Sequence, residues 1–88
     1  MTKVIVYATG TCPYCRQAEE LLIRKGVHFE TIRVDHDPEM RAEMMRITGR
    51  RTVPQIIINE KPIGGFDDLY QLDQSGQLDT LLHEQTGK

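Results

Sequence analysis

The sequence predicts an α/β fold, with a four-stranded mixed sheet covered by helices on both faces. Two observations carry this prediction. Short apolar runs alternate with segments of helical periodicity in the order β-α-β-α-β-β-α, and glycine or proline stands at most of the boundaries. The β-α-β unit predicts two parallel strands with a right-handed crossover, and the later hairpin is expected to add two strands antiparallel to that pair.

The first strand and the first helix are expected at residues 3–8 and 13–25. Residues 3–8 are nearly all apolar and several are β-branched, which is typical of a strand covered on both faces. Pro13 suits the first helical position, and Gly26 suits a C-terminal stop. Apolar residues recur along this helix at three- and four-residue spacing, which predicts one buried stripe formed by Cys15, Ala18, Leu21 and Leu22.

A second strand is expected over residues 28–34, followed by a second helix. Asp37 is a suitable N-cap, Pro38 a suitable first helical residue and Gly49 a suitable end. The apolar face of this helix is expected to contain Met40, Met44 and Ile47.

The last third of the chain predicts a hairpin and a final helical region. Strands over residues 55–58 and 61–63 are joined by a two-residue turn, and Gly64-Gly65 breaks the second of them. A helix is expected from about Asp67, and Gly76 interrupts its apolar pattern.

Length, charge and apolar content limit the classes to which this protein can belong. The 88 residues allow one domain, expected to span 1–88, whose tail should fray from Gln85. A net charge of -2 argues against general nucleic-acid binding, which needs a basic face. The apolar run at the start is too short for a signal peptide or a membrane span, so we expect a cytoplasmic protein in a reducing compartment.

The segment Cys12-Pro13-Tyr14-Cys15 carries the chemistry. It follows a predicted strand and opens a predicted helix, which is the context of a thioredoxin-like redox motif. Residues three apart share a helix face, so the two sulfurs can close a disulfide. The unpaired N–H groups and dipole at the helix start favour the thiolate of Cys12, the expected nucleophile. Cys15, one turn further in, is expected to be the less exposed, resolving thiol.

Other uses of two cysteines are less favoured. A structural disulfide is rare in a reducing compartment. A zinc site needs two further ligands, and the three histidines (His28, His36 and His83) lack the paired spacing of a zinc module. Inert paired thiols do not explain a proline placed between two cysteines at a helix start.

Three further segments are candidate sites, each with an ordinary structural alternative. The triplet Thr52-Val53-Pro54 precedes a strand, where proline can simply begin the strand. Gly64-Gly65-Phe66-Asp67-Asp68 allows close backbone approach and begins a helix that suits a carboxylate ligand, or one of its aspartates merely caps that helix. Arg50-Arg51 could bind an anion, or could form a solvated helix end.

Taken together, these segments resemble the glutaredoxin family, and most closely its short bacterial dithiol type. The resemblance rests on the stretch from Tyr7 to Cys15, on Thr52-Val53-Pro54 and on Gly64-Gly65-Phe66-Asp67-Asp68 in that order and spacing. It implies a thioredoxin fold with strand order 2-1-3-4 and a cis Pro54. It also implies a glutathione-disulfide oxidoreductase that reduces protein-glutathione mixed disulfides and protein disulfides, ribonucleotide reductase being one compatible partner.

The resemblance also assigns the binding residues. Glutathione, the reducing co-substrate, would contact Tyr14, Arg51, Thr52, Val53, Pro54, Gly65, Phe66, Asp67 and Asp68. No permanently bound cofactor is expected, and the protein is expected to be a monomer. One position departs from the family pattern, because Thr9 stands where a lysine is usual; Arg16 or Arg51 could partly compensate.

Two alternative functions remain open. The first is a glutaredoxin-like redoxin supplied by thioredoxin reductase, against which the pair Asp67-Asp68 argues. The second is a [2Fe-2S] cluster bridged between two subunits through the first cysteine and glutathione, which Pro13 is expected to disfavour.

Overall fold

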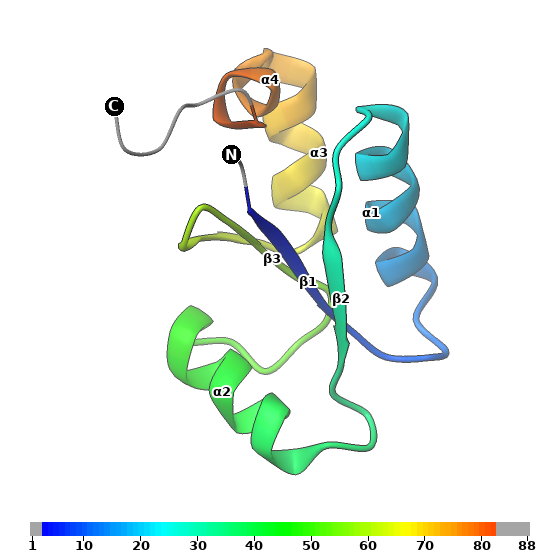
Figure 1. The fold of residues 1–88 in the computed structure, drawn as a ribbon, viewed down its shortest axis with the longest axis vertical. Helices are drawn as coiled ribbons and strands as arrows, with labels where there is room; N and C mark the ends of the chain where they lie inside the picture. The colour runs from blue at the N-terminus through cyan, green and yellow to red at the C-terminus, as the bar shows by residue number, and fades with distance from the viewer. Residues whose placement is uncertain (1–2, 83–88) are drawn as a thin grey trace.

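The computed structural model describes residues 3–82 and has the expected order of elements, except that the last helical region is divided at Gly76 into two helices (Figure 1). The fraying predicted from Gln85 lies outside the described residues. The elements in chain order are β1 (Val4–Ala8), α1 (Pro13–Arg24), β2 (Glu30–Arg33), α2 (Pro38–Thr48), β3 (Gln55–Ile58), β4 (Lys61–Gly64), α3 (Phe66–Ser75) and α4 (Gln77–Leu82).

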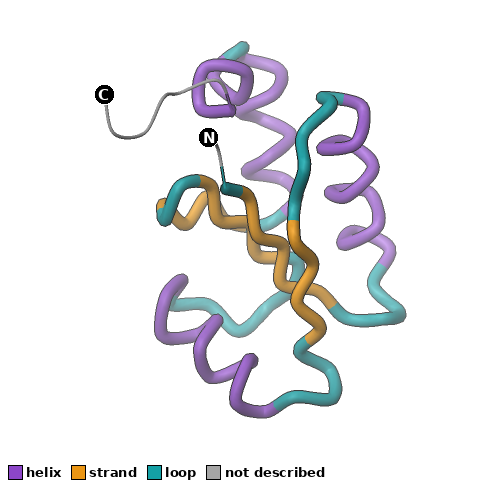
Figure 2. Tube along the Cα trace, in the orientation of Figure 1, coloured by secondary structure: helices purple, strands orange, loops and turns teal. Residues whose placement is uncertain are grey.

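The four strands form one mixed sheet in the order β2-β1-β3-β4, as the resemblance implied (Figure 2). β1 pairs parallel with β2 and antiparallel with β3, and β3 pairs antiparallel with β4. β4 therefore runs in the same direction as β1. The expectation that both hairpin strands oppose the first pair is correct for β3 and wrong for β4, because a hairpin turn reverses the chain a second time.

Helices cover both faces of the sheet, as predicted: α1 and α3 lie on one face and α2 on the other (Figure 1). We call the first layer the α1/α3 face; its buried residues are Val4, Val6, Ala8, Cys15, Ala18, Leu21, Leu22, Ile56, Ile58, Leu69, Leu78 and Leu82. The second layer, the α2 face, buries Tyr7, Val34, Met44 and Ile57. Alternate residues of β1 and β3 point to opposite faces, so the central strands are covered on both sides.

The helix boundaries follow the capping residues, with two differences. α1 ends at Arg24 with Lys25 as its C-cap, one residue earlier than expected. Asp37 accepts the N–H of Met40 at 3.1 Å and begins α2, and Gly49 ends it in the left-handed conformation, both as expected. The third helix begins at Phe66, one residue before the predicted start, because Gly65 and not Asp67 is its N-cap. Gly64 belongs to β4 and does not break it.

None of the helices within residues 3–82 is long and apolar enough to cross a membrane.

Candidate functional site

Cys12 is the N-cap of α1, in the position that its sequence context predicts. Its backbone is extended (φ -100°, ψ 109°), and Pro13 occupies the first turn. Its Sγ accepts the backbone N–H of Cys15 at 3.1 Å. A sulfur at this position receives one of the backbone N–H groups that the start of a helix leaves unpaired.

Cys15 lies one helical turn further along and belongs to the core of the α1/α3 face. It is 2% exposed, whereas Cys12 is partly exposed, and both are free thiols. Burial, followed by the hydrogen bond with Cys12, raises the pKa of Cys15 to about 12, and a hydrogen bond from the backbone of Thr9 acts in the opposite direction. Only Cys12 is therefore open to attack from outside, and Cys15 stays protonated at neutral pH.

The loop before β3 lies against the nucleophile. The Cys12 thiol points at the carbonyl oxygen of Val53, with 3.8 Å between sulfur and oxygen. The Val53–Pro54 peptide bond is cis, as the resemblance implied. A Cβ at Gly65 would lie 3.4 Å from the carbonyl oxygen of Pro54, so the start of α3 also packs closely on this loop.

These segments enclose a groove of about 310 Å³. Its lining residues are Tyr14, Arg50, Thr52, Val53, Pro54, Gln55, Gly65, Phe66, Asp67 and Asp68. The structure thus brings together all the residues expected to contact glutathione except Arg51. Cys12 is not itself a lining residue, but stands beside Val53 at the edge of the groove.

A glutaredoxin family model matches residues 4–63 of the chain. A glutaredoxin of Pseudomonas aeruginosa is 52% identical over 82 residues, which cover 93% of this chain and 98% of the relative. Glutaredoxin 3 of Escherichia coli is 50% identical over 82 residues, covering 93% of this chain and 99% of the relative. The chain belongs to the glutaredoxin family. It is therefore a thiol-disulfide oxidoreductase with the thioredoxin fold.

Solved glutaredoxin structures agree with this fold. The solution structure of a glutaredoxin from Brucella melitensis has a TM-score of 0.83 and 50% identity, covering all of this chain and 94% of that one. A buckwheat glutaredoxin-glutathione complex has a TM-score of 0.85 and 30% identity, covering 92% of this chain and 76% of that one.

At the start of α3, the two aspartates of this glutaredoxin have different partners. Asp68 accepts the backbone N–H of Gly65 at 3.0 Å and pairs with the guanidinium of Arg50 at 3.2 Å. The capping role that the sequence allowed for either aspartate thus belongs to Asp68. Within residues 3–82, the carboxylate of Asp67 has no hydrogen-bond or ion-pair partner, so it remains available to a ligand.

Arg50 and Gln55 line the groove although the sequence did not single them out as contact residues. For the pair Arg50-Arg51 the sequence allows either anion binding or a solvated helix end. In the structure, the ion pair of Arg50 with Asp68 places Arg50 at the groove. Gln55 had been treated as a strand residue. It is 1% exposed and donates to Thr52 Oγ1 at 3.2 Å, which supports the loop from beneath.

An aromatic row borders the groove. The rings of Tyr14 and Phe66 lie 6.1 Å apart between centroids, and those of Phe66 and Tyr70 lie 5.9 Å apart. Tyr14 is 58% exposed, which is high for a large aromatic side chain. Tyr14 and Phe66 thus give the groove an aromatic side made of mutually tilted rings.

A second hollow of about 540 Å³ lies beside the cysteines, between α1 and β2. It is lined by Cys12 and Cys15, by the loop of residues 9–11, and by polar side chains that include Glu19, Thr31 and Arg33. Within the described residues, no three His, Cys, Asp or Glu side chains come together as a metal site. His83 lies outside that part of the chain.

Proposed function

We propose that this glutaredoxin reduces protein-glutathione mixed disulfides and protein disulfides with glutathione as its electron donor, through a Cys12-Cys15 pair. The observation that carries the proposal is the contrast between the two sulfurs. Cys12 is partly exposed at a helix start and next to the groove, and Cys15 is buried one turn behind it.

Deglutathionylation needs Cys12 alone. The Cys12 thiolate attacks the glutathione sulfur of a mixed disulfide, and the electron pair of the broken S–S bond leaves with the substrate thiol. A second glutathione thiolate then attacks the glutathione sulfur of the Cys12 adduct. This step releases oxidised glutathione and restores the Cys12 thiolate. Each turnover consumes one free glutathione, because the other half of the oxidised glutathione comes from the substrate.

Reduction of a protein disulfide also needs Cys15. Cys12 forms a mixed disulfide with the substrate, and Cys15 then attacks Cys12 Sγ, so that the substrate leaves as a dithiol and the Cys12-Cys15 bond closes. Two glutathione molecules reopen that bond. The raised pKa of Cys15 keeps it from competing with Cys12 for external disulfides.

The groove would hold glutathione through the backbone of the tripeptide and through the two ends of the tripeptide. Val53 would pair with the tripeptide backbone as a short added strand, with Thr52 and Pro54 fixing the loop. Gly65, Phe66 and the unpaired carboxylate of Asp67 would hold the γ-glutamyl end, with Asp68 fixing the start of α3, and Tyr14 would flank the ligand. Arg50 lines the groove and would contact the glycyl carboxylate, the role that the resemblance to glutaredoxins suggested for Arg51.

The remaining properties follow the same proposal. The protein would act in the cytoplasm as a monomer built from one domain over residues 1–88. Its partners would be glutathionylated and disulfide-containing proteins, ribonucleotide reductase among the compatible ones. A backbone-reading groove tolerates varied side chains, which suits a broad set of substrates.

The test follows two reactions in parallel with purified protein. Cys12→Ser should abolish glutathione-dependent reduction of a small glutathione mixed disulfide and of a protein disulfide. Cys15→Ser should retain the first reaction and lose most of the second. If Cys15 proves essential for the mixed disulfide while Cys12 does not, the assigned roles are wrong.

The electron donor is tested separately. Wild-type protein should turn over with glutathione, glutathione reductase and NADPH, and not with thioredoxin reductase and NADPH. Turnover with thioredoxin reductase alone would instead identify a glutaredoxin-like redoxin.

A further inference from the structure

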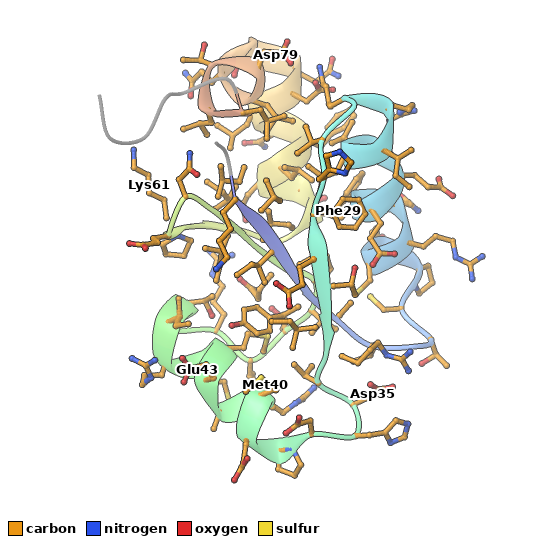
Figure 3. All side chains as sticks on the ribbon, viewed as in Figure 1. Phe29, Asp35, Met40, Glu43, Lys61 and Asp79 are labelled. Atoms are coloured by element: carbon orange, nitrogen blue, oxygen red, sulfur yellow. The ribbon has the colours of Figure 1, made fainter. Side chains whose placement is uncertain are left out.

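The loop that precedes Cys12 is tied to the end of the neighbouring strand. β1 and β2 are parallel, so both chains leave the sheet at the same edge (Figure 1). Asp35 lies in the turn between β2 and α2, just beyond that edge (Figure 3). The pairing of the two strands continues past β2, because Val34 N–H donates to the carbonyl of Ala8 at 2.9 Å. Asp35 is therefore brought alongside residues 9 and 10.

Asp35 fixes the backbone of that loop. Its Oδ2 accepts the N–H of Gly10 at 3.1 Å. Both of its carboxylate oxygens are held by Arg33, whose Nε donates to Oδ1 at 3.1 Å and whose Nη2 donates to Oδ2 at 2.7 Å. The Asp35 side chain is 24% exposed, and His36 lies 3.7 Å away on its outer side.

Gly10 is packed tightly against this ion pair. A Cβ at position 10 would collide with the guanidinium of Arg33, and would lie 3.4 Å from Asp35 Oδ2. Arg33 also holds the pKa of the Asp35 carboxyl well below its usual range, so the carboxylate acceptor is present at neutral pH. We call this arrangement the brace. It consists of the Asp35 carboxylate as hydrogen-bond acceptor, the Arg33 guanidinium that holds the carboxylate, and Gly10, which has no side chain.

The residue next to Gly10 reaches the buried sulfur. Thr9, Gly10 and Cys15 line the same hollow. A hydrogen bond from the Thr9 backbone lowers the pKa of Cys15 against the effect of burial. Two neighbouring residues of this short loop therefore have different contacts. Asp35 holds the backbone of Gly10, and the backbone of Thr9 lies against Cys15. A planar peptide unit links the two residues, so fixing Gly10 limits how far Thr9 can move.

We propose that Asp35, clamped by Arg33, is a positioning residue for the opening of the Cys12-Cys15 disulfide. The inference rests on the proposed function. In that step a glutathione thiolate attacks Cys12 Sγ, a Cys12-glutathione bond forms, and the Cys12-Cys15 bond breaks. Its electron pair goes to Cys15 Sγ, which then takes a proton from water. The Thr9 backbone hydrogen bond stabilises the negative charge that develops on Cys15, and Asp35 holds that backbone in place.

Asp35 has this positioning role only where the Cys12-Cys15 disulfide is opened, which belongs to the reduction of protein disulfides. Deglutathionylation by Cys12 alone places no charge on Cys15, so it does not need the brace. A general distortion of the site would slow both branches together, and this difference separates positioning from structural support.

The test measures opening of the preformed Cys12-Cys15 disulfide by excess glutathione in a stopped-flow instrument. Asp35→Ala should slow it about three- to tenfold, the range for loss of one ordinary hydrogen bond. Asp35→Asn should recover most of the rate, because its amide oxygen can still accept the Gly10 N–H. Arg33→Gln should give a smaller loss in the same direction.

Controls come from the same chain. Glu43→Gln breaks a comparable exposed carboxylate-arginine pair, with Arg46 on α2, and should leave the rate unchanged. In the Cys15→Ser background, Asp35→Ala should leave deglutathionylation within about twofold, less than the loss of one hydrogen bond would cause. Equal slowing of both branches, or no slowing of disulfide opening, overturns the inference. Absence of any glutathione-dependent turnover in the wild-type protein overturns the proposed function itself.

Discussion

At the scale of single residues, the two sulfurs differ because of what surrounds each of them. Cys12 stands where a helix begins and receives the N–H of Cys15. Cys15 is enclosed by apolar side chains of the α1/α3 face, where an anion is costly. Two chemically identical side chains thus acquire different roles from a spacing of three residues. The same spacing keeps them close enough to bond.

The raised pKa of Cys15 predicts a loss of stability in alkali. Its folded pKa of about 12 lies above the ordinary value of 9.0, so folding favours the protonated thiol. This contribution is complete below pH 9 and is lost as the pH rises toward 12. We expect urea unfolding of Cys12→Ser to show a falling free energy above pH 9 that Cys12→Ser/Cys15→Ala lacks. Parallel profiles for the two variants would contradict this prediction.

The two neighbouring arginines predict different effects on glutathione affinity. Arg50 lines the groove and Arg51 does not. Arg50→Gln should raise the KM for glutathione about two- to fivefold, as expected for loss of an exposed charge contact. Arg51→Gln removes the same charge one residue away and should leave the KM nearly unchanged. The reverse pattern in steady-state kinetics would return the role to Arg51.

At the scale of elements, the start of α3 depends on a strained hairpin end. Gly64 has a φ of 123°, a conformation that residues with a side chain rarely adopt. A Cβ there would also collide with the carboxylate of Asp68. That carboxylate holds Gly65 and Arg50, so the geometry of Gly64 determines how the groove wall is built.

Gly64→Ala should therefore damage both stability and the site. We expect the free energy of unfolding to fall by about 2–3 kcal/mol and the KM for glutathione to rise. Gly26→Ala is the matched control. Gly26 has a φ of 72° with nothing near its missing Cβ, so its substitution should cost about 1–2 kcal/mol and leave the KM unchanged. A raised KM in both variants would show that the effect is general.

Elements whose ends carry a side-chain signal could be predicted from the sequence, and those that depend on tertiary contact could not. Pro13, Asp37 and Gly49 mark helix ends by their own chemistry, and all three lie where expected. Gly65 caps α3 without a side chain, so nothing in the sequence distinguishes it from the aspartates that follow. The choice of Arg50 over Arg51 depends on Asp68, eighteen residues away, which no local pattern shows.

At the scale of the whole molecule, the sheet separates the redox site from the smaller layer of the core, on the α2 face. Cys15 and the α3 residue Leu69 are buried in the α1/α3 face, while Met44 of α2 is buried on the opposite side. Val53 packs against both layers, and its carbonyl oxygen also contacts the Cys12 thiol. Stability and catalysis can therefore be separated by choosing the face that is altered.

Met44→Ala and Leu69→Ala test this separation. Both side chains are fully buried, so each truncation should lower the free energy of unfolding by about 2–5 kcal/mol. A domain of this size has a total free energy of unfolding of about 4–13 kcal/mol, so urea unfolding should be measured first and activity assayed where both variants remain folded.

Met44→Ala should keep the wild-type kcat/KM, because its cavity opens on the face away from the cysteines. Leu69→Ala should lower it, because Leu69 holds α3, which carries Phe66 and Asp67, against the sheet. Equal loss of kcat/KM in the two variants would show that the sheet transmits the disturbance and does not isolate the site.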